Sequence, residues 1–145
     1  MSSRSDQNFD GLPDWAQRPL IMQVFAQARA LGGEARIVGG AVRDWLANYP
    51  VGDIDMAINL PIETVASHMV ACDTRVVETG LKHGTITLYD NDDQIELTQT
   101  RVDLKTDGRH AIVAHDQDWV RDAVRRDFTI NALYLDAYGG VFDPL

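Results

Sequence analysis

The chain has 145 residues, of which 45% are hydrophobic and 24% are charged, as in an ordinary globular domain. These figures argue against wholesale disorder and a collagen-like repeat, and Cys72 as the single cysteine excludes an intrachain disulfide. The net charge of −9 is unusual for a free-standing nucleic-acid binder, although eleven of the thirteen basic residues are arginines, which grip phosphate well. No apolar run approaches the roughly 18 residues of a membrane span, so we expect a cytoplasmic protein with no membrane partner.

The first half of the chain alternates predicted helices and strands. Residues 1–13 are expected to form a flexible leader, and residues 14–145 one domain. Apolar residues at helical spacing predict a helix over 14–31, which Gly32-Gly33 ends. The further elements expected here are a strand at 35–38, a short helix at 41–48, a strand at 53–59 and a helix that Pro61 opens.

The second half is predicted to contain more strands. Residues 102–116 lack periodicity and predict a long loop, and Asp118 is suited to cap a helix over 119–126. The expected strands are 74–80, 83–90 and 94–101, with a hairpin over 133–143 that turns at Gly139-Gly140. This order predicts a mixed α/β (α+β) fold with a partly antiparallel sheet. Because the sequence stops at VFDPL without a polar tail, we expect it to be a truncated piece.

Asp53 and Asp55 are the first pair of residues that indicate chemistry. On a strand, alternate side chains share a face, so the two carboxylates would project together roughly 7 Å apart. Carboxylates this close repel each other unless a cation lies between them, and Mg²⁺ is commonly held by two such groups. The alternative is an ordinary polar strand end.

Glu96 lies in another predicted strand, between the apolar residues Ile95 and Leu97. If that strand neighbours the one with Asp53 and Asp55, three carboxylates share one face and form a site for two metal ions that catalyses phosphoryl displacement. The alternative is a solvent-facing glutamate on a half-exposed strand.

The segment Val38-Gly39-Gly40-Ala41-Val42-Arg43-Asp44 predicts a strand, a tight turn and the start of a helix. Glycines let backbone N–H groups approach an anion, and the positive end of the helix dipole assists them. Arg43 would lie in the first helical turn, where a cation is disfavoured unless a highly charged anion such as a triphosphate is bound. The alternative is that Arg43 pairs with Asp44 or with a distant acid.

Two further segments carry charge into apolar surroundings. Asp127 and Asn131 are four residues apart and would share one helix face, where they need hydrogen-bond partners such as a sugar hydroxyl. One of Arg125 and Arg126 would then reach a nucleotide, unless the helix is a salt-bridged surface helix. The loop with Arg101 and Arg109 would close over a substrate, or else is an ordinary exposed loop.

The motifs VGGAVRD, GDIDMAI, HGTIT, IELTQTR, TDGRHA and RRDFTINAL occur in this order between about residues 36 and 144. This combination resembles the head domain of the class II tRNA nucleotidyltransferases, the CCA-adding enzymes, and of the related bacterial poly(A) polymerases. The resemblance implies a palm like that of DNA polymerase β, with a mixed, largely antiparallel sheet backed by helices. It also implies transfer of CMP and AMP from CTP and ATP to the 3′ end of tRNA, with release of pyrophosphate.

The resemblance assigns roles to individual residues. Asp53, Asp55 and Glu96 match the catalytic carboxylates that hold two Mg²⁺ ions, for which Mn²⁺ is an expected substitute. Gly39, Gly40, Arg43 and Asp44 match the turn that holds the triphosphate. The remaining matches are Arg126, Asp127 and Asn131, which contact the sugar and phosphates, and the loop with Arg101 and Arg109, which helps to switch between CTP and ATP.

The family's base-reading motif lies in a neck domain beyond the head, and nothing in this chain matches it. The neck, body and tail, or a second polypeptide that supplies them, are therefore expected partners, and we expect the isolated chain to be weakly active or inactive. Alternatives are a poly(A) polymerase head and a non-catalytic nucleotide- or RNA-binding fragment.

Overall fold

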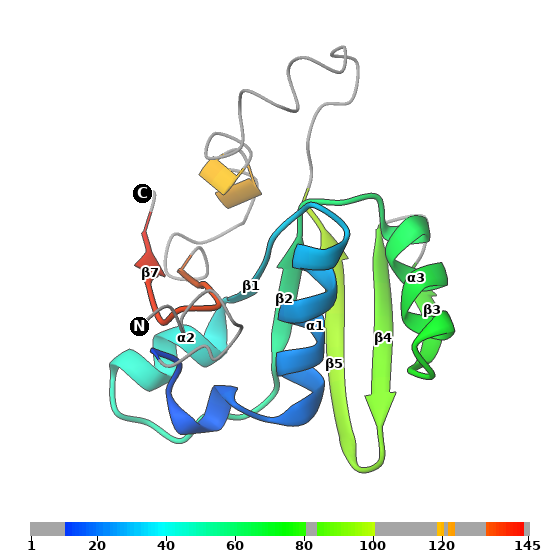
Figure 1. Ribbon diagram of the computed structural model, residues 1–145. Helices are drawn as coiled ribbons and strands as arrows, with labels where there is room; N and C mark the ends of the chain where they lie inside the picture. Colours follow the sequence, from blue (N-terminus) through cyan, green and yellow to red (C-terminus); the bar gives the residue numbers. More distant parts are fainter. Residues whose placement is uncertain (1–10, 81–83, 101–118, 121, 124–132, 144–145) are drawn as a thin grey trace, which may run out of the picture.

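The computed structural model describes residues 11–80, 84–100, 119–120, 122–123 and 133–143 (Figure 1). These residues form a sheet with helices packed against it. After a 3-10 turn at Asp14–Ala16, the helices are α1 (Pro19–Ala30), α2 (Gly40–Leu46) and α3 (Ile62–Ala71). The strands are β1 (Ala35–Val38), β2 (Asp55–Ile58), β3 (Arg75–Gly80), β4 (Thr85–Asp90), β5 (Asp93–Gln99), β6 (Tyr134–Leu135) and β7 (Val141–Phe142).

The described strands form one seven-stranded sheet in the order β3-β4-β5-β2-β1-β6-β7. Among these strands only β2 and β5 pair in parallel, with Asp55 opposite Glu96 and Ile58 opposite Gln99. The other neighbours pair antiparallel. The predicted mixed α/β fold with a largely antiparallel sheet is confirmed. A strand lies within or across each predicted strand range, with different bounds, and the hairpin of β6 and β7 is present. Residues 83 and 101 of the predicted strands lie outside the described residues.

The first helix was predicted to begin at residue 14, and this is wrong. Residues 14–16 form a separate 3-10 turn, and α1 begins at Pro19. The ring of Pro19 disfavours the helical conformation for the residue before it, and Arg18 is accordingly extended, with φ −69° and ψ 146°. Pro19 itself suits the first position of a helix, where its missing N–H group costs nothing.

The strand predicted over 53–59 is shorter than expected. β2 begins at Asp55, so Asp53 lies in the segment that leads into the strand and not on the strand itself. The inward direction of Ile54 and Met56 is confirmed, since they are 3% and 1% exposed.

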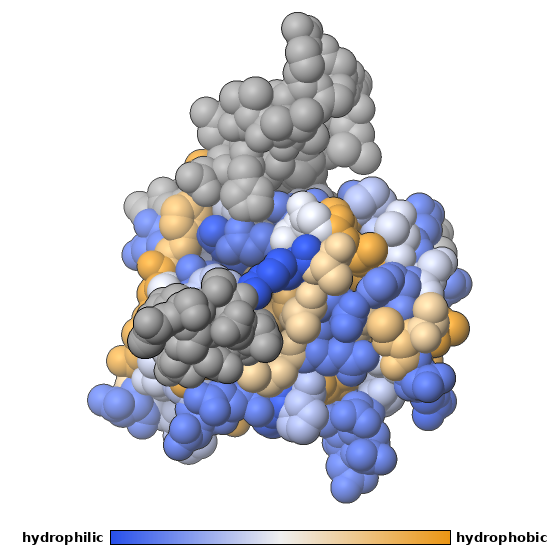
Figure 2. Space-filling view, in the orientation of Figure 1, coloured by the Kyte–Doolittle hydropathy of each residue, from blue (hydrophilic) through white to orange (hydrophobic). Residues whose placement is uncertain are grey.

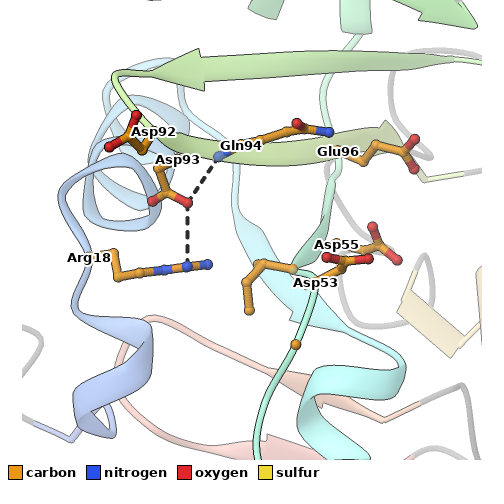
Figure 3. Close-up of a pocket in the computed structure, with 9 residues that line it drawn as sticks. Arg18, Asp53, Asp55, Asp92, Asp93, Gln94 and Glu96 are labelled. Atoms are coloured by element: carbon orange, nitrogen blue, oxygen red, sulfur yellow. Dashed lines mark hydrogen bonds and ion pairs between the residues drawn. The ribbon is translucent and has the colours of Figure 1, made fainter.

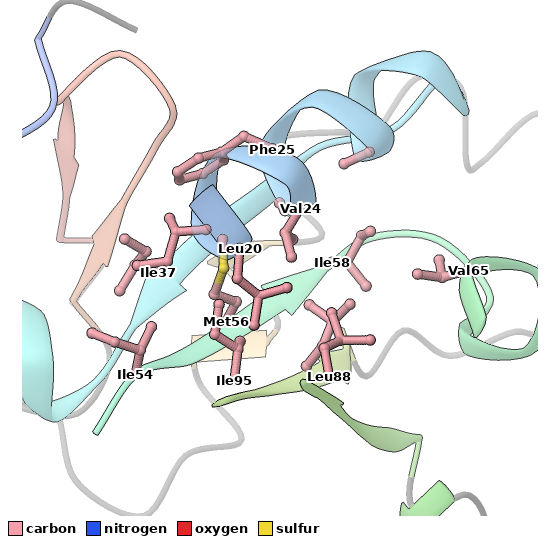
Figure 4. Close-up of a cluster of buried hydrophobic side chains, with 14 of the residues drawn as sticks. Leu20, Val24, Phe25, Ile37, Ile54, Met56, Ile58, Val65, Leu88 and Ile95 are labelled. Atoms are coloured by element: carbon pink, nitrogen blue, oxygen red, sulfur yellow. The ribbon is translucent and has the colours of Figure 1, made fainter. Parts of the chain in front are cut away.

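Helices α1 and α3 cover one face of the sheet, and the main core lies between them and the strands (Figures 1 and 4). Alternate residues of β1, β2, β4 and β5 enter this core, as the period of two requires. Figure 4 shows Leu20, Val24 and Phe25 of α1 directed at Ile37 and Met56 of the sheet. The other strand residues that reach this core include Ala35, Ile58, Ile86, Leu88, Ile95, Leu97 and Leu135.

Leu12 is 4% exposed and belongs to this core. Packing therefore begins within the segment expected to be a flexible leader, whose residues 1–10 lie outside the described ones. The outer surface seen in Figure 2 is largely hydrophilic, with smaller apolar areas between the charged residues. None of the described helices has the length and apolar character required to cross a membrane.

Candidate active site

The opposite face of the sheet carries the predicted carboxylates. Because Met56 and Leu97 point into the main core, Asp55 and Glu96 must point away from it. They are direct register partners across β2 and β5, so their side chains project from adjacent strands at the same level. The condition set in the sequence analysis, that the strand of Glu96 neighbours the strand of Asp55, is therefore met.

Asp53, Asp55 and Glu96 line one open pocket of about 540 Å³ (Figure 3). All three are exposed, whereas Ile54 between the two aspartates is buried and fixes this stretch of backbone against the core. Figure 3 shows the three carboxylates at one end of the pocket, away from Arg18. The arrangement gathers negative charge from two strands into one solvent-accessible hollow.

These three side chains are suitable ligands for a hard divalent cation. Carboxylate oxygens are the ligands that Mg²⁺ and Mn²⁺ prefer, and Mg²⁺ typically keeps several waters and binds through few protein groups. Within the described part of the chain, no three acidic, histidine or cysteine side chains are already drawn together around a metal position. All three carboxylates are exposed, so a hydrated ion can reach them from solvent.

The glycine turn lies beside this pocket. Gly39 follows Val38, whose register partner on β2 is Asp55. Its φ of 85° and ψ of −135° belong to a region that residues with a Cβ atom rarely adopt. The Gly39 N–H donates to the Leu133 carbonyl oxygen at 3.1 Å, which ties the turn to the chain entering β6.

Arg43 lies against this turn, but the dipole argument for it was wrong. α2 has only seven residues, and Arg43 falls in its last turn and not its first. Its Nε donates to Asp44 Oδ1 at 3.1 Å, the alternative partner considered above. Its Nη2 lies 3.2 Å from the position that a Cβ atom on Gly40 would occupy, so the guanidinium folds back over the glycine turn.

Arg101, Arg109, Arg126, Asp127 and Asn131 lie outside the described residues, as does the loop over 102–116. Their predicted roles therefore remain predictions.

The pocket also contains residues that the sequence did not indicate. Arg18 Nη1 lies 3.3 Å from Asp93 Oδ1 and closes the end of the pocket opposite the three carboxylates. Gln94 and Asp92 complete the lining on the β4–β5 hairpin. Gln94 was predictable as a neighbour, because it precedes Glu96 by two residues and so shares its face. Arg18 was not, since a contact between such distant parts of the chain leaves no local pattern.

A second buried cluster lies on the same face as Asp55. It consists of Val38, Ala57, Trp119, Ala123 and Tyr134, with Phe142 packed against it.

The charged residue Arg36 is only 8% exposed and stacks on this cluster. Its guanidinium carbon lies 4.4 Å from the ring centroid of Trp119 and 5.0 Å from that of Phe142. Its Nε donates to Glu34 Oε2 at 2.8 Å. Sequence analysis missed this cluster because its members come from four separate stretches of chain.

Comparison with known proteins agrees with this geometry. A family model described as the poly A polymerase head domain matches residues 35–145. The mitochondrial CCA tRNA nucleotidyltransferase 1 of Danio rerio is 43% identical over 111 residues, which are 76% of this chain and 26% of that protein.

Two solved structures are also similar. The Bacillus stearothermophilus CCA-adding enzyme in complex with CTP gives a TM-score of 0.71 at 30% identity, over 92% of this chain and 31% of that one. A tRNA nucleotidyltransferase complexed with a primer tRNA and an incoming ATP analogue gives a TM-score of 0.63 at 27% identity, over 83% of this chain and 34% of that one.

The chain thus spans about a quarter to a third of the length of these relatives. The similarity confirms the resemblance drawn from the motifs, and the family model covers most of the sequence. The chain therefore belongs to the family of poly A polymerase head domains.

Proposed function

We propose that this chain is the catalytic head of a nucleotidyltransferase that extends the 3′ end of tRNA. In the proposed reaction the terminal 3′-hydroxyl of the RNA attacks the α-phosphate of CTP or ATP, and pyrophosphate leaves. The observation that carries the proposal is the register of β2 and β5, which sets Asp55 directly opposite Glu96 on one exposed face.

Asp53, Asp55 and Glu96 are the residues that would hold Mg²⁺ or Mn²⁺. Bound divalent cations supply Lewis-acid polarisation of the α-phosphate and neutralise the charge on the leaving pyrophosphate. The contribution of the chain is to fix Asp55 and Glu96 on neighbouring strands and Asp53 in the segment that leads into β2. Ile54, Met56 and Leu97 are buried behind them. Their backbone positions therefore do not have to be organised during the reaction.

The glycine turn and Arg43 are proposed to bind the triphosphate. In the structure, the guanidinium of Arg43 already lies over Gly40, but one of its N–H groups is held by Asp44. This pair is partly exposed, and exposed pairs of this kind contribute at most about 1 kcal/mol. A phosphate oxygen can therefore replace Asp44 as the acceptor at small cost. Until a nucleotide binds, Asp44 orients the arginine.

Arg126, Asp127 and Asn131 are proposed to contact the sugar and phosphates of the nucleotide, and Arg101 and Arg109 to lie in the loop that helps to choose between CTP and ATP. These roles rest on the matched family motif.

Addition of C and A to tRNA is proposed from the relatives. Two of those relatives are named for CCA, and one of these was solved with CTP. The third, named as a tRNA nucleotidyltransferase, was solved with a primer tRNA and an ATP analogue. A poly(A) polymerase head is the second candidate, favoured by the description of the matching family model. Base selection and tRNA binding are assigned to the further regions that those longer relatives possess. The cytoplasmic location stays a prediction, since one matched relative is mitochondrial.

The test uses this chain and a chimera in which it replaces the corresponding head of the Bacillus stearothermophilus enzyme. Both are incubated with Mg²⁺, labelled CTP or ATP, and tRNA that lacks its 3′ CCA. We expect the chimera to add nucleotides in the order C, C, A, and the chain alone to incorporate them weakly and with little selectivity.

The matched variants in the chimera are Asp55→Ala and Asp92→Ala, because both residues are exposed acids of the same pocket. Asp55→Ala is expected to abolish extension, whereas Asp92→Ala is expected to leave most of it. Substantial extension by the Asp55→Ala chimera would contradict the proposed site. Addition of A alone would favour the poly(A) polymerase assignment.

A further inference from the structure

Arg75 and Tyr89 form a surface pair on the face of the sheet that carries Asp55 and Glu96. The guanidinium carbon of Arg75 lies 5.0 Å from the ring centroid of Tyr89, and the two residues are register partners on β3 and β4. Arg75 is exposed and Tyr89 is partly exposed. The fold thus presents a cation and an aromatic ring side by side to solvent, and the proposed reaction gives a role to neither.

This pair lies next to the proposed metal ligands. Tyr89 is the register partner of Gln94 on β5, and Gln94 precedes Glu96 by two residues on the same face. Tyr89 and Glu96 are therefore diagonal neighbours on adjacent strands, with Cα atoms about 7–8 Å apart. Gln94 also lines the pocket of the three carboxylates (Figure 3). One side chain, Gln94, therefore links the pair to that pocket.

The face beside the pair carries few acids, although the net charge of the chain is −9. Of the three acids in β4 and β5, only Glu96 lies on this face. Asp90 and Asp93 lie on the other face, because they alternate in step with the buried residues of the main core. The remaining residues of these strands on the face of Glu96 are uncharged: Thr85, Thr87, Tyr89, Gln94 and Thr98. A phosphate that approaches Arg75 over β4 and β5 thus meets no carboxylate of these strands except a proposed metal ligand.

We infer that Arg75 and Tyr89 bind the single-stranded 3′ end of the RNA that is extended. This inference rests on the proposed function, in which the terminal 3′-hydroxyl reacts beside Asp55 and Glu96. Whichever region holds the rest of the tRNA, its last nucleotides must therefore lie on this chain. Single strands are commonly held by aromatic rings that stack on their bases and by cations that contact their phosphates. Tyr89 supplies such a ring and Arg75 such a cation.

The position of the pair agrees with an in-line displacement. In the strand order β3-β4-β5-β2-β1, the carboxylates lie on β5 and at the start of β2. Tyr89 on β4 is on one side of them, and the glycine turn that follows β1 is on the other. The attacking and leaving oxygens must lie on opposite sides of the α-phosphate. With the triphosphate at the glycine turn, RNA stacked on Tyr89 delivers its hydroxyl from the required side.

A pair that only supports the sheet would behave differently. Its loss would lower the melting temperature and leave the affinity of the folded protein for RNA unchanged. A binding pair changes the affinity for RNA, and its loss leaves the affinity for CTP unchanged, because the proposed triphosphate site lies on the other side of the carboxylates.

The experiment measures the Kd of the 145-residue chain for a short, 5′-labelled single-stranded RNA that ends in CC. Fluorescence anisotropy is recorded with Mg²⁺, at a temperature where every variant is folded. We expect Tyr89→Ala to raise the Kd about tenfold, whereas Tyr89→Phe, which keeps the ring, should stay within about twofold of wild type. Arg75→Gln should weaken binding and lower the slope of log Kd against log salt concentration by about 0.7, the value for one phosphate contact to a single strand.

Arg29→Gln is the matched control. Arg29 is an exposed arginine of α1, and its guanidinium carbon lies 5.4 Å from the ring centroid of Tyr138. Because α1 covers the opposite face of the sheet (Figure 1), this variant removes the same charge and a similar ring contact away from the carboxylates. We expect its Kd for the RNA to stay within about twofold of wild type. The Kd for CTP with Mg²⁺, measured by calorimetry, should be that of wild type in all four variants.

A wild-type RNA affinity in Tyr89→Ala would overturn the inference, as would equal losses in Arg75→Gln and Arg29→Gln or the absence of RNA binding by the wild-type chain. A wild-type dimer that Tyr89→Ala converts to a monomer in sedimentation would assign the face to a second copy of the chain, and would also overturn it. Each of these results leaves the proposed function standing as long as CTP binds with Mg²⁺. If the wild-type chain did not bind CTP, the proposed function would fail, and the assignment of the RNA as the extended strand with it.

Discussion

The Cα atoms of Asp55 and Glu96 are paired across the parallel strands β2 and β5, with both side chains on the face opposite the main core. Parallel neighbours cannot be joined by a tight turn, and the chain between these two strands forms α3, β3 and β4. The fold thus brings together acids that are distant in sequence, and burial of Met56 and Leu97 fixes the face on which they lie. A shift of one residue in either strand would separate them.

The first prediction concerns metal binding by Glu96. Glu96→Gln keeps the size of the side chain and removes its charge, so we expect the affinity for Mn²⁺ to fall about tenfold or more. Because Glu96 is exposed, the free energy of unfolding should change by less than about 0.5 kcal/mol. Electron paramagnetic resonance of free Mn²⁺ measures the affinity. The control is Glu78→Gln, an exposed glutamate on β3; equal losses of Mn²⁺ affinity in both variants would contradict the site.

The second prediction concerns the turn at Gly39. A Cβ atom at a φ of 85° is strained, so Gly39→Ala should lower the free energy of unfolding by about 1–3 kcal/mol. Gly52→Ala is the control, because a Cβ atom there meets nothing within 4 Å and Gly52 has no positive φ. That control should be neutral or stabilising by up to about 1 kcal/mol. Urea denaturation measures both, and an unchanged midpoint for Gly39→Ala would show that the turn tolerates a side chain.

The sequence predicted those features of the fold that depend on neighbouring residues. Alternation in Asp53-Ile54-Asp55-Met56 correctly placed Ile54 and Met56 in the core, since burial of one face is a local pattern. The start of α1 was wrong because a helical stripe of apolar residues outweighed the steric effect of Pro19 on Arg18.

The features that sequence analysis missed are contacts between distant segments. The ion pair of Arg18 with Asp93 and the hydrogen bond of Tyr134 to Asp122 depend on how strands are ordered in the sheet. No periodicity encodes that order. The adjacency of Asp55 and Glu96 could be predicted only conditionally, because the sequence shows two strands with acids but not that they pair.

The third prediction concerns the main core. Leu88 on β4 is fully buried, so Leu88→Ala should lower the free energy of unfolding by about 2–5 kcal/mol through lost burial and the cavity left behind. Leu46→Ala at the end of α2 is the matched control, since Leu46 is 50% exposed and should change stability by less than about 0.5 kcal/mol. Urea denaturation of both variants is the measurement. If the two variants lost similar amounts of unfolding free energy, Leu88 on β4 would not be part of the main core.

The fourth prediction compares the loss of stability when a buried arginine, Arg36, or an exposed one, Arg75, is replaced by alanine. Arg36 stacks on Trp119 and Phe142 and bonds to Glu34, so Arg36→Ala removes packing, cation–π contact and an ion pair together. We expect the free energy of unfolding to fall by about 2–4 kcal/mol. Arg75→Ala is the control, because the Arg75 guanidinium also lies over a ring, that of Tyr89 at 5.0 Å, but the residue is exposed.

For Arg75→Ala we expect the free energy of unfolding to fall by less than about 1 kcal/mol, because a cation–π contact at an exposed site competes with solvation of the cation by water. Repeating the urea denaturation of both variants with added salt distinguishes the buried contacts of Arg36 from charge effects at the surface. The Arg36 effect should persist in 1 M NaCl, since its cation is buried between rings, whereas screening removes charge effects at the surface. Equal losses from the two substitutions in urea denaturation would show that Arg36 does not tie β1 to Trp119 and β7. The second cluster would then be held on the sheet by its packing with Val38 and Ala57 and by the pairing of Tyr134 with Val38.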